Sequence, residues 1–350
     1  MTSRIAIVGA GAVGSYVGAH MIQAGEDVVL IDQYPAHIDA MRRQGLHISG
    51  LAPRDNFSTP VNALHICDVQ RLAKQKPVDI ALIAVKAYDT SWAAALIAPY
   101  MAASGIAVSM QNGINDDQVA AIVGRERTLG VTIAGCGVDL KTPGHVKRAN
   151  VSAEGHMVFR TGEMDGQTTD RVKELVRVLS KADAAAITNN LAAERWSKLV
   201  VNAMRPGLAS LTKINIPDQD RNDVTRGLMV KLAAEAVRVG QALGYPMVKI
   251  QGIEPETMLL ADSGDATALE KVKAVLFDFA SRYDDNTMPS MAQDIVKGRR
   301  TEVDGLNGLI VEKGRQAGVS TPINAEILAR VRRLERGEIE AGLHTVSDLI

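Results

Sequence analysis

The feature that most constrains the fold is a glycine-rich turn joining an apolar strand to an apolar helix at the start of the chain. Residues 4–8 (RIAIV) predict a buried strand, GAGAVG follows at 9–14, and an apolar helix continues to about residue 24. The first glycine permits a tight turn, the second allows the backbone to approach a pyrophosphate, and the third allows close helix packing. The helix N-terminus adds N–H groups that attract phosphate. The pattern predicts a Rossmann dinucleotide-binding fold with the cofactor at Gly9, Gly11, Ala12, Val13 and Gly14.

A second predicted strand, residues 27–31, ends at Asp32, which follows Gly14 by 18 residues. A carboxylate at this place binds the ribose 2′-hydroxyl of NAD and repels the 2′-phosphate of NADP. We therefore expect NAD(H) to be preferred over NADP(H). The alternative is a glycine-rich turn with an incidental aspartate, since a glycine fingerprint alone is weak.

Two later strands of the predicted sheet, residues 78–85 and 105–110, are followed by polar residues. Ligands of doubly wound sheets lie beyond the carboxyl ends of the strands, so Lys86 and Asn112 are candidates for contact with cofactor or substrate. Each also has an ordinary explanation, a solvated lysine and a plain Asn-Gly turn. Short strands at 128–132, 135–140 and 157–160, with a turn at 142–144, predict hairpins at the edge of the sheet.

Beyond residue 189 the periodicity becomes continuously helical, which places a domain boundary there. We expect a Rossmann domain over residues 1–188 and an all-helical domain over 189–350. The tail after Arg336 is expected to be loosely held unless Leu343 or Ile350 docks. The predicted helices cover 189–204, 222–243, 255–261, 268–283, 289–297, 302–317 and 323–336.

The helix that opens the second half carries polar side chains on one face of an otherwise apolar sequence. Lys198, Asn202 and Arg205 fall at i, i+4 and i+7. Because Lys and Arg are rarely buried without a partner, this face either borders water or lines a cleft with an anionic occupant. Both explanations stay open on the helix alone.

Composition excludes several classes of partner. The 350 residues carry 39 basic and 40 acidic side chains, a net charge of -1, so no field directs the chain to nucleic acid or an anionic membrane. Cys67 and Cys136 match no metal spacing and suit free thiols in a reducing compartment. We expect a cytoplasmic protein without a metal, acting on a small molecule. Its apolar helices could pack within one subunit or across a homodimer.

The stretch from Ser290 to Gly308 follows the pattern SMxxDxxxxRxTEVDxxNG. Together with the glycine-rich turn, the Lys86 strand end, the Gln111-Asn112-Gly113 segment and the helix around Lys198, this stretch makes the chain resemble the ketopantoate reductase (2-dehydropantoate 2-reductase) family. The resemblance runs from about residue 3 to residue 330. It implies reduction of a short 2-oxo acid with a nicotinamide cofactor.

The resemblance also implies roles for individual residues. Lys198 matches the lysine that gives a proton to the keto oxygen, and Glu302 matches the glutamate that binds the substrate's hydroxyl. An ammonium group can stabilise and then protonate the oxygen on which hydride addition places negative charge. Asn202 and Ser290 match substrate-binding positions, and Lys86 and Asn112 match positions that line the site near the nicotinamide and substrate. The resemblance therefore implies that the polar face of the helix around Lys198 forms the wall of a cleft between the domains.

Two positions depart from the family pattern. Members that prefer NADPH usually have a basic residue where this chain has Asp32, which again favours NAD(H). The family often has an asparagine where this chain has Arg205. That guanidinium either pairs with the carboxylate of a bulkier or more acidic substrate, or pairs with Glu194 or another carboxylate of the protein.

Two other functions stay open. An NAD-dependent dehydrogenase that oxidises D-2-hydroxy acids in a catabolic route would use the same residues, and Asp32 favours it because NAD pools favour oxidation. A non-catalytic NAD(H)-binding regulator would need only the fold. The presence of both Lys198 and Glu302 argues against the regulator.

Overall fold

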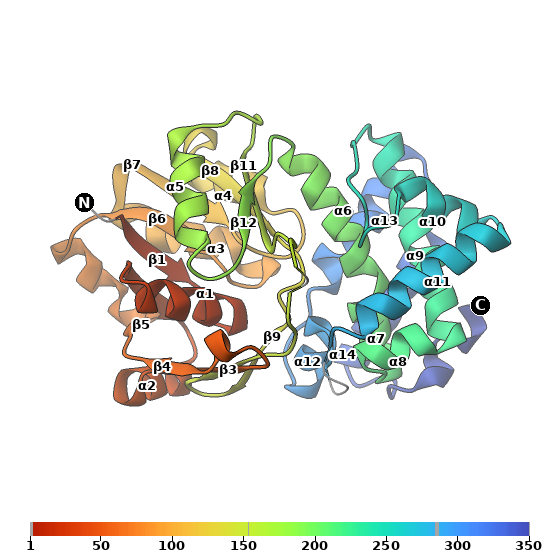
Figure 1. The fold of residues 1–350 in the computed structure, drawn as a ribbon, viewed down its shortest axis with the longest axis horizontal. Helices are drawn as coiled ribbons and strands as arrows, with labels where there is room; N and C mark the ends of the chain where they lie inside the picture. The colour runs from red at the N-terminus through yellow and green to blue at the C-terminus, as the bar shows by residue number, and fades with distance from the viewer. Residues whose placement is uncertain (1–2, 153, 284–286, 350) are drawn as a thin grey trace. The chain divides into compact units, whose positions relative to one another are not determined.

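The computed structural model describes residues 3–152, 154–283 and 287–349. The chain divides into two compact units, Met1–Leu191 and Ala192–Ile350. Within the described residues every named strand lies in the first unit, and the second is built of helices (Figure 1). This confirms the predicted fold class, an α/β Rossmann domain followed by a helical domain.

The first unit is built on an eight-stranded sheet in the order β12-β11-β8-β7-β6-β1-β2-β5. Strands β5, β2, β1, β6, β7 and β8 are parallel, whereas β11 pairs antiparallel with β8 and parallel with β12. All five residues of β1 are buried, because an interior parallel strand is covered on both faces. The strands are β1 (Arg4–Val8), β2 (Asp27–Asp32), β5 (Asn62–His65), β6 (Val78–Ile83), β7 (Met101–Ser109), β8 (Thr128–Ile133), β11 (Phe159–Glu163) and β12 (Ala185–Ile187).

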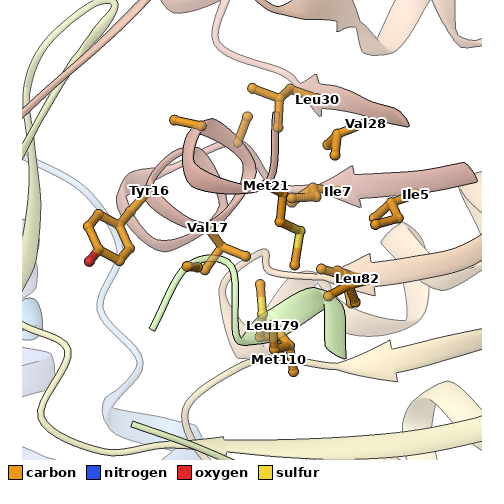
Figure 2. Packing of buried hydrophobic residues seen from close by; sticks show 14 of the residues in the cluster. Ile5, Ile7, Tyr16, Val17, Met21, Val28, Leu30, Leu82, Met110 and Leu179 are labelled. Atoms are coloured by element: carbon orange, nitrogen blue, oxygen red, sulfur yellow. The ribbon is translucent and has the colours of Figure 1, made fainter. Parts of the chain in front are cut away.

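Helix α1 lies in the hydrophobic core of the first unit. Figure 2 shows Val17 and Met21 pointing toward Ile7 and Leu82 of the sheet, while Tyr16 leaves the helix on another side. Every α1 residue from Gly14 to Met21 is buried, as expected for a helix that is covered all round. The helices of this unit are α1 (Ala12–Gln23), α2 (Pro35–Gln44), α3 (Thr90–Ile97), α4 (Asp116–Val123) and α5 (Asp170–Leu179).

A second, four-stranded sheet covers the other side of α1, in the order β4-β3-β10-β9. The hairpin around residues 142–144 is present, but the prediction that it lies at the edge of the main sheet is wrong. Strand β10 pairs in parallel with β3, a strand about 100 residues earlier, with His145 opposite His47. Such a pairing has no local signature in sequence. The strands are β3 (Leu46–Gly50), β4 (Phe57–Thr59), β9 (Val138–Thr142) and β10 (His145–Arg148).

The helices of the second unit follow the predicted order, with two additions and one correction. Residues 206–212 and 216–221 also form helices, each with a proline in its first turn, where proline is favoured. The helix predicted over 302–317 begins only at Asn307, and Val303–Gly305 forms a single 3-10 turn, η6. The helices are α6 (Leu191–Met204), α7 (Pro206–Thr212), α8 (Ile216–Arg221), α9 (Asp223–Ala242), α10 (Pro255–Asp262), α11 (Ala266–Ala280), α12 (Ser290–Val296), α13 (Asn307–Ala317) and α14 (Pro322–Glu335).

The described residues contain neither a membrane-spanning helix nor a cluster of metal ligands. None of their helices combines the length and the apolar character needed to cross a membrane. Nor do three or more of their His, Cys, Asp or Glu side chains gather where they could hold a metal ion.

Candidate functional site

The glycine-rich turn connects β1 to α1 and leaves an open space on one side. A Cβ on Gly9 (φ +100°) would lie 2.5 Å from the amide nitrogen of Val85, and one on Gly14 would lie 2.1 Å from the carbonyl oxygen of Gly9. Both positions therefore require glycine. Among the residues that the structure describes, a Cβ on Gly11 would meet nothing within 4 Å. Gly11 is also the N-cap of α1, so the first N–H groups of the helix adjoin this open space, which suits an anion.

Asp32 ends β2, next to the glycine-rich turn. Its Oδ1 accepts a hydrogen bond of 2.8 Å from the backbone N–H of Tyr34, which fixes the carboxylate at the strand end. The turn and the strand are joined directly, because the N–H groups of Gly9 and Ala10 both donate to the carbonyl of Ile31. The carboxylate and the helix N-terminus thus belong to one continuous structure, as a dinucleotide site requires.

Lys86 and Asn112 follow β6 and β7, which are adjacent in the sheet. Both side chains are half-buried. Gln111 is not among the residues to which the sequence assigns a role, and it links the two strand ends. Its buried Nε2 donates to the carbonyl oxygen of Val85 and to Oγ1 of Thr90, both at 2.9 Å. The sheet therefore brings Gly9–Gly14, Asp32, Lys86 and Asn112 together at the carboxyl ends of its parallel strands, as the strand pattern predicts.

In the second unit, α6 carries Lys198 and Asn202 one turn apart. Lys198 is half-buried and Asn202 is 6% exposed. Trp196, on the opposite side of the helix, is fully buried and donates from Nε1 to the carbonyl of Ala236 at 3.1 Å. Ser197 both donates to the carbonyl and accepts from the N–H of Val248, at 3.0 and 2.9 Å. These contacts fix the rotation of α6 and therefore the direction of Lys198.

The remaining candidates of the second unit lie on either side of a short connection. Ser290 opens α12, which packs against α7, and Glu302 is 5% exposed just before η6. Asn307, the asparagine of the TEVDxxNG motif, joins this segment to α6, since its Nδ2 donates to the carbonyl of Ala203 at 3.1 Å. The same Nδ2 donates to Oδ1 of Asn324 at 2.9 Å. The motif is therefore held against the end of the helix that carries Lys198.

Arg205 forms an ion pair within the second unit. Its two terminal nitrogens lie 3.0 and 2.8 Å from the carboxylate oxygens of Asp220, and the side chains are 5% and 0% exposed. Burial raises the pKa of Asp220, and the charge of Arg205 opposes that rise. Arg205 therefore pairs with a carboxylate of the protein, which is one of the two alternatives that the sequence leaves open. The partner is Asp220 rather than Glu194.

Comparison with known proteins covers nearly the whole chain. The family described as "Ketopantoate reductase PanE/ApbA" matches residues 5–163, and "Ketopantoate reductase PanE/ApbA C terminal" matches residues 190–335. The 2-dehydropantoate 2-reductase of Archaeoglobus fulgidus is 30% identical over 95% of this chain and 98% of its own length. That of Pyrococcus horikoshii is 26% identical over 95% and 97%.

Solved structures have the same architecture. A PanE/ApbA family ketopantoate reductase from Ralstonia eutropha has a TM-score of 0.75 and 25% identity, with 96% of this chain and 99% of that one covered. A D-mandelate dehydrogenase solved with NADH and anilino(oxo)acetate has a TM-score of 0.77 at 21% identity, with 95% and 99% covered. The second similarity concerns the fold alone.

Proposed function

We propose that this chain, which belongs to the ketopantoate reductase family, reduces a short 2-oxo acid to the 2-hydroxy acid with a nicotinamide dinucleotide, in a reaction of the 2-dehydropantoate-to-pantoate type. The observation that carries the proposal is similarity through both units to enzymes of that name, at up to 30% identity. The chain is accordingly an oxidoreductase acting on CH–OH groups.

The glycine-rich turn fits the pyrophosphate of such a cofactor, because the open side of Gly11 adjoins the N-terminus of α1. Gly9, Gly11, Ala12, Val13 and Gly14 would hold it, and the bound cofactor would supply the hydride. The carboxylate of Asp32 would accept hydrogen bonds from the ribose hydroxyls. A 2′-phosphate at that place would meet a negative charge, so we expect NAD(H) to be preferred. Lys86 and Asn112 would lie near the nicotinamide end.

Lys198 would act as general acid. As hydride adds to C2 of the substrate, the carbonyl π electrons move to oxygen, and the ammonium of Lys198 stabilises that charge and transfers a proton to it. Glu302 would accept a hydrogen bond from the substrate's hydroxyl, and Asn202, Asn112 and Ser290 would orient the acid. The contacts of Trp196 and Ser197 support this role, since they fix the rotation of the helix that carries Lys198.

The same residues could catalyse the reverse reaction, an NAD-dependent oxidation of a D-2-hydroxy acid. Asp32 is the observation that favours this second candidate, because it favours NAD. Initial rates measured in both directions with NAD(H) and NADP(H), over a panel of 2-oxo and 2-hydroxy acids, distinguish the two.

The experiment that tests the proposal is replacement of Lys198 by Ala, with Lys271→Ala on the exposed face of α11 as the matched control. Loss of a general acid lowers turnover roughly 10²–10⁴-fold. NADH binding, followed by fluorescence, should stay at the wild-type value, and the control should keep full turnover. A wild-type protein that binds NADH but converts no acid of the panel would instead support the non-catalytic regulator.

A further inference from the structure

A buried histidine, His37, contacts the back of the glycine-rich turn. It lies in the first turn of α2 and is fully buried. Its Nε2 is 2.9 Å from the carbonyl oxygen of Ala10 and 3.1 Å from Oγ of Ser15. Its Nδ1 accepts a hydrogen bond of 2.8 Å from the backbone N–H of Gly144. The imidazole thus connects the turn to the β9–β10 hairpin, whose Gly144 lies 107 residues after His37 in the chain.

These partners determine which nitrogen carries the proton. The backbone N–H of Gly144 can only donate, so Nδ1 is unprotonated and a neutral ring carries its proton on Nε2. Ser15 donates its own hydroxyl proton to the carbonyl of Ala10 at 2.7 Å. The carbonyl of Ala10 therefore receives two hydrogen bonds from inside the protein, one from the imidazole and one from the hydroxyl.

Fixing that carbonyl also fixes the next N–H group. The peptide between Ala10 and Gly11 is trans, and in a trans peptide the C=O and N–H bonds point in opposite directions. With the carbonyl of Ala10 directed at His37, the N–H of Gly11 points away from it. Gly11 is the residue whose missing Cβ leaves an open space at the start of α1.

The same histidine is close in sequence to Asp32. Tyr34 donates its backbone N–H to the carboxylate, and its ring stacks on that of His37 at a centroid distance of 6.3 Å. The segment from Asp32 to His37 therefore includes both the proposed ribose contact and the contact behind the pyrophosphate turn.

We propose that His37 is a positioning residue for the dinucleotide: in its Nε2-protonated form it orients the Ala10–Gly11 peptide so that the N–H of Gly11 is directed at the cofactor's pyrophosphate. This inference rests on the proposed function, because it assumes a dinucleotide ligand. In this arrangement the backbone N–H of Gly144 selects the tautomer of His37, because it donates to Nδ1.

Two substitutions separate positioning from simple loss of stability. The substitution His37→Asn places the amide oxygen where Nδ1 was, so it keeps the hydrogen bond from Gly144 and loses the one to Ala10. The substitution His37→Gln places the amide nitrogen near the position of Nε2, so it keeps the hydrogen bond to Ala10 and loses the one from Gly144. Each loses one buried hydrogen bond, so a purely structural role predicts the same effect for both. The control is His20→Gln, because His20 is also a buried histidine but contacts Asp55 and not the glycine-rich turn. Its Nε2 lies 3.2 Å from Oδ1 of Asp55.

NADH binding to each variant, measured by fluorescence titration, gives the main result. We expect His37→Asn to raise the dissociation constant roughly 5–10-fold, the effect of one net hydrogen bond. His37→Gln and His20→Gln should stay within about twofold of wild type. In steady-state assays His37→Asn should raise the KM for NADH and leave kcat at saturation unchanged.

Nitrogen-15 NMR of the histidine rings in the cofactor-free protein gives a result that does not depend on activity. The inference requires the ring proton of His37 on Nε2. A proton on Nδ1, or equal dissociation constants for the Asn and Gln variants beside a wild type that binds NADH, overturns the inference and leaves the proposed function intact. A wild type that binds neither NADH nor NADPH overturns both.

Discussion

The ion pair of Arg205 and Asp220 is held almost entirely out of water in the second unit. A buried pair of this kind contributes little net stability, because the cost of desolvating two charges offsets their attraction. Removing one partner is different, since it leaves an uncompensated charge in the interior. The guanidinium also lies over the ring of Phe279, with 5.0 Å between Cζ and the ring centroid. Arg205 is therefore central to the packing of this unit.

Replacing Arg205 by Leu should lower the free energy of unfolding by about 3–5 kcal/mol, because Asp220 stays buried without its partner. The double replacement Arg205→Leu with Asp220→Leu should recover most of that loss. Urea denaturation followed by circular dichroism measures both. The KM of folded Arg205→Leu protein for the best substrate tests whether Arg205 also contacts the substrate's carboxylate. An unchanged value leaves Arg205 a structural role only, whereas a large rise would show that it also meets substrate.

Asp32 provides a second test at the level of one side chain. Replacing it by Asn removes the charge that would repel a 2′-phosphate and weakens the acceptor for the ribose hydroxyls. The ratio of kcat/KM with NADH to that with NADPH should fall on the order of tenfold, which corresponds to about 1.4 kcal/mol. Asp39→Asn, at an exposed aspartate of α2, is the control. Equal rates of the wild type with both cofactors would contradict the assignment of Asp32.

At the scale of elements, the contact between α6 and α9 depends on a glycine. Trp196 contacts both Gly240 and Tyr245. Its ring stacks on that of Tyr245, with 4.8 Å between the ring centroids and 11° between the ring planes. A Cβ on Gly240 would lie 2.1 Å from Nε1 of Trp196. Glycine is a poor helix former, but here it allows α9 to approach the tryptophan that fixes α6.

Two alanine substitutions on α9 should therefore change the free energy of unfolding in opposite directions. At Gly227 a Cβ would meet no atom of the described part of the chain within 4 Å. Alanine there should stabilise the protein by roughly 0.5–1 kcal/mol through its helix propensity. At Gly240 the same gain is outweighed by overpacking, and a net loss of about 1–3 kcal/mol is expected. Urea denaturation gives both values. Stabilisation by Gly240→Ala would show that Trp196 moves aside without cost.

Several elements could be predicted because their signals are local. The strand, glycine-rich turn and helix of residues 4–23 follow from spacing alone, and Lys86 and Asn112 follow from the ends of apolar strands. The sequence does not predict helix α7, because Pro206 and Gly207 resemble the end of a helix, although proline also suits the first turn of a new one. Residues 302–306 keep a helical spacing but form a turn, since the N–H of Gly305 bonds to the carbonyl of Glu302 at 3.0 Å.

At the scale of the molecule, the features that sequence could not reveal are pairings between distant residues. His37 depends on Gly144, and the motif around Glu302 depends on the bond from Asn307 to Ala203, 104 residues apart. The composition of each segment gives no sign of these partners. The roles that we propose for Lys198 and Glu302 come from the family resemblance, because neither spacing nor burial singles out these two residues.

The end of the chain shows the same limit. The sequence predicts a loosely held tail unless Leu343 or Ile350 docks. Ile350 lies outside the described residues, and Leu343 is 38% exposed. The tail docks instead through Val346, which is fully buried, and through two hydrogen bonds to the carbonyl of Leu211. The N–H of Gly342 donates to the carbonyl of Leu211 at 2.7 Å, and Oγ1 of Thr345 donates to the same carbonyl at 3.0 Å.

A pair of charges completes this attachment and makes it dependent on pH. Both terminal nitrogens of Arg330 bond to the carboxylate of Asp348, at 2.6 and 2.7 Å, and lower the pKa of Asp348 to about 2. The pKa of an unpaired aspartate is about 3.9. Because the folded value is the lower one, the pair stabilises the docked tail above about pH 4, and the effect is lost as the pH falls toward 2.

Hydrogen exchange of the amides of residues 343–349, corrected for intrinsic rates, should therefore show protection that declines between about pH 4 and pH 2. The decline should be small, because the carboxylate is exposed and water screens the pair. Asp348→Asn is the matched variant: its protection at neutral pH should already be reduced and should change less over the same interval. Identical profiles for the two proteins would mean that Val346 and the bonds to Leu211 hold the tail without help from the ion pair.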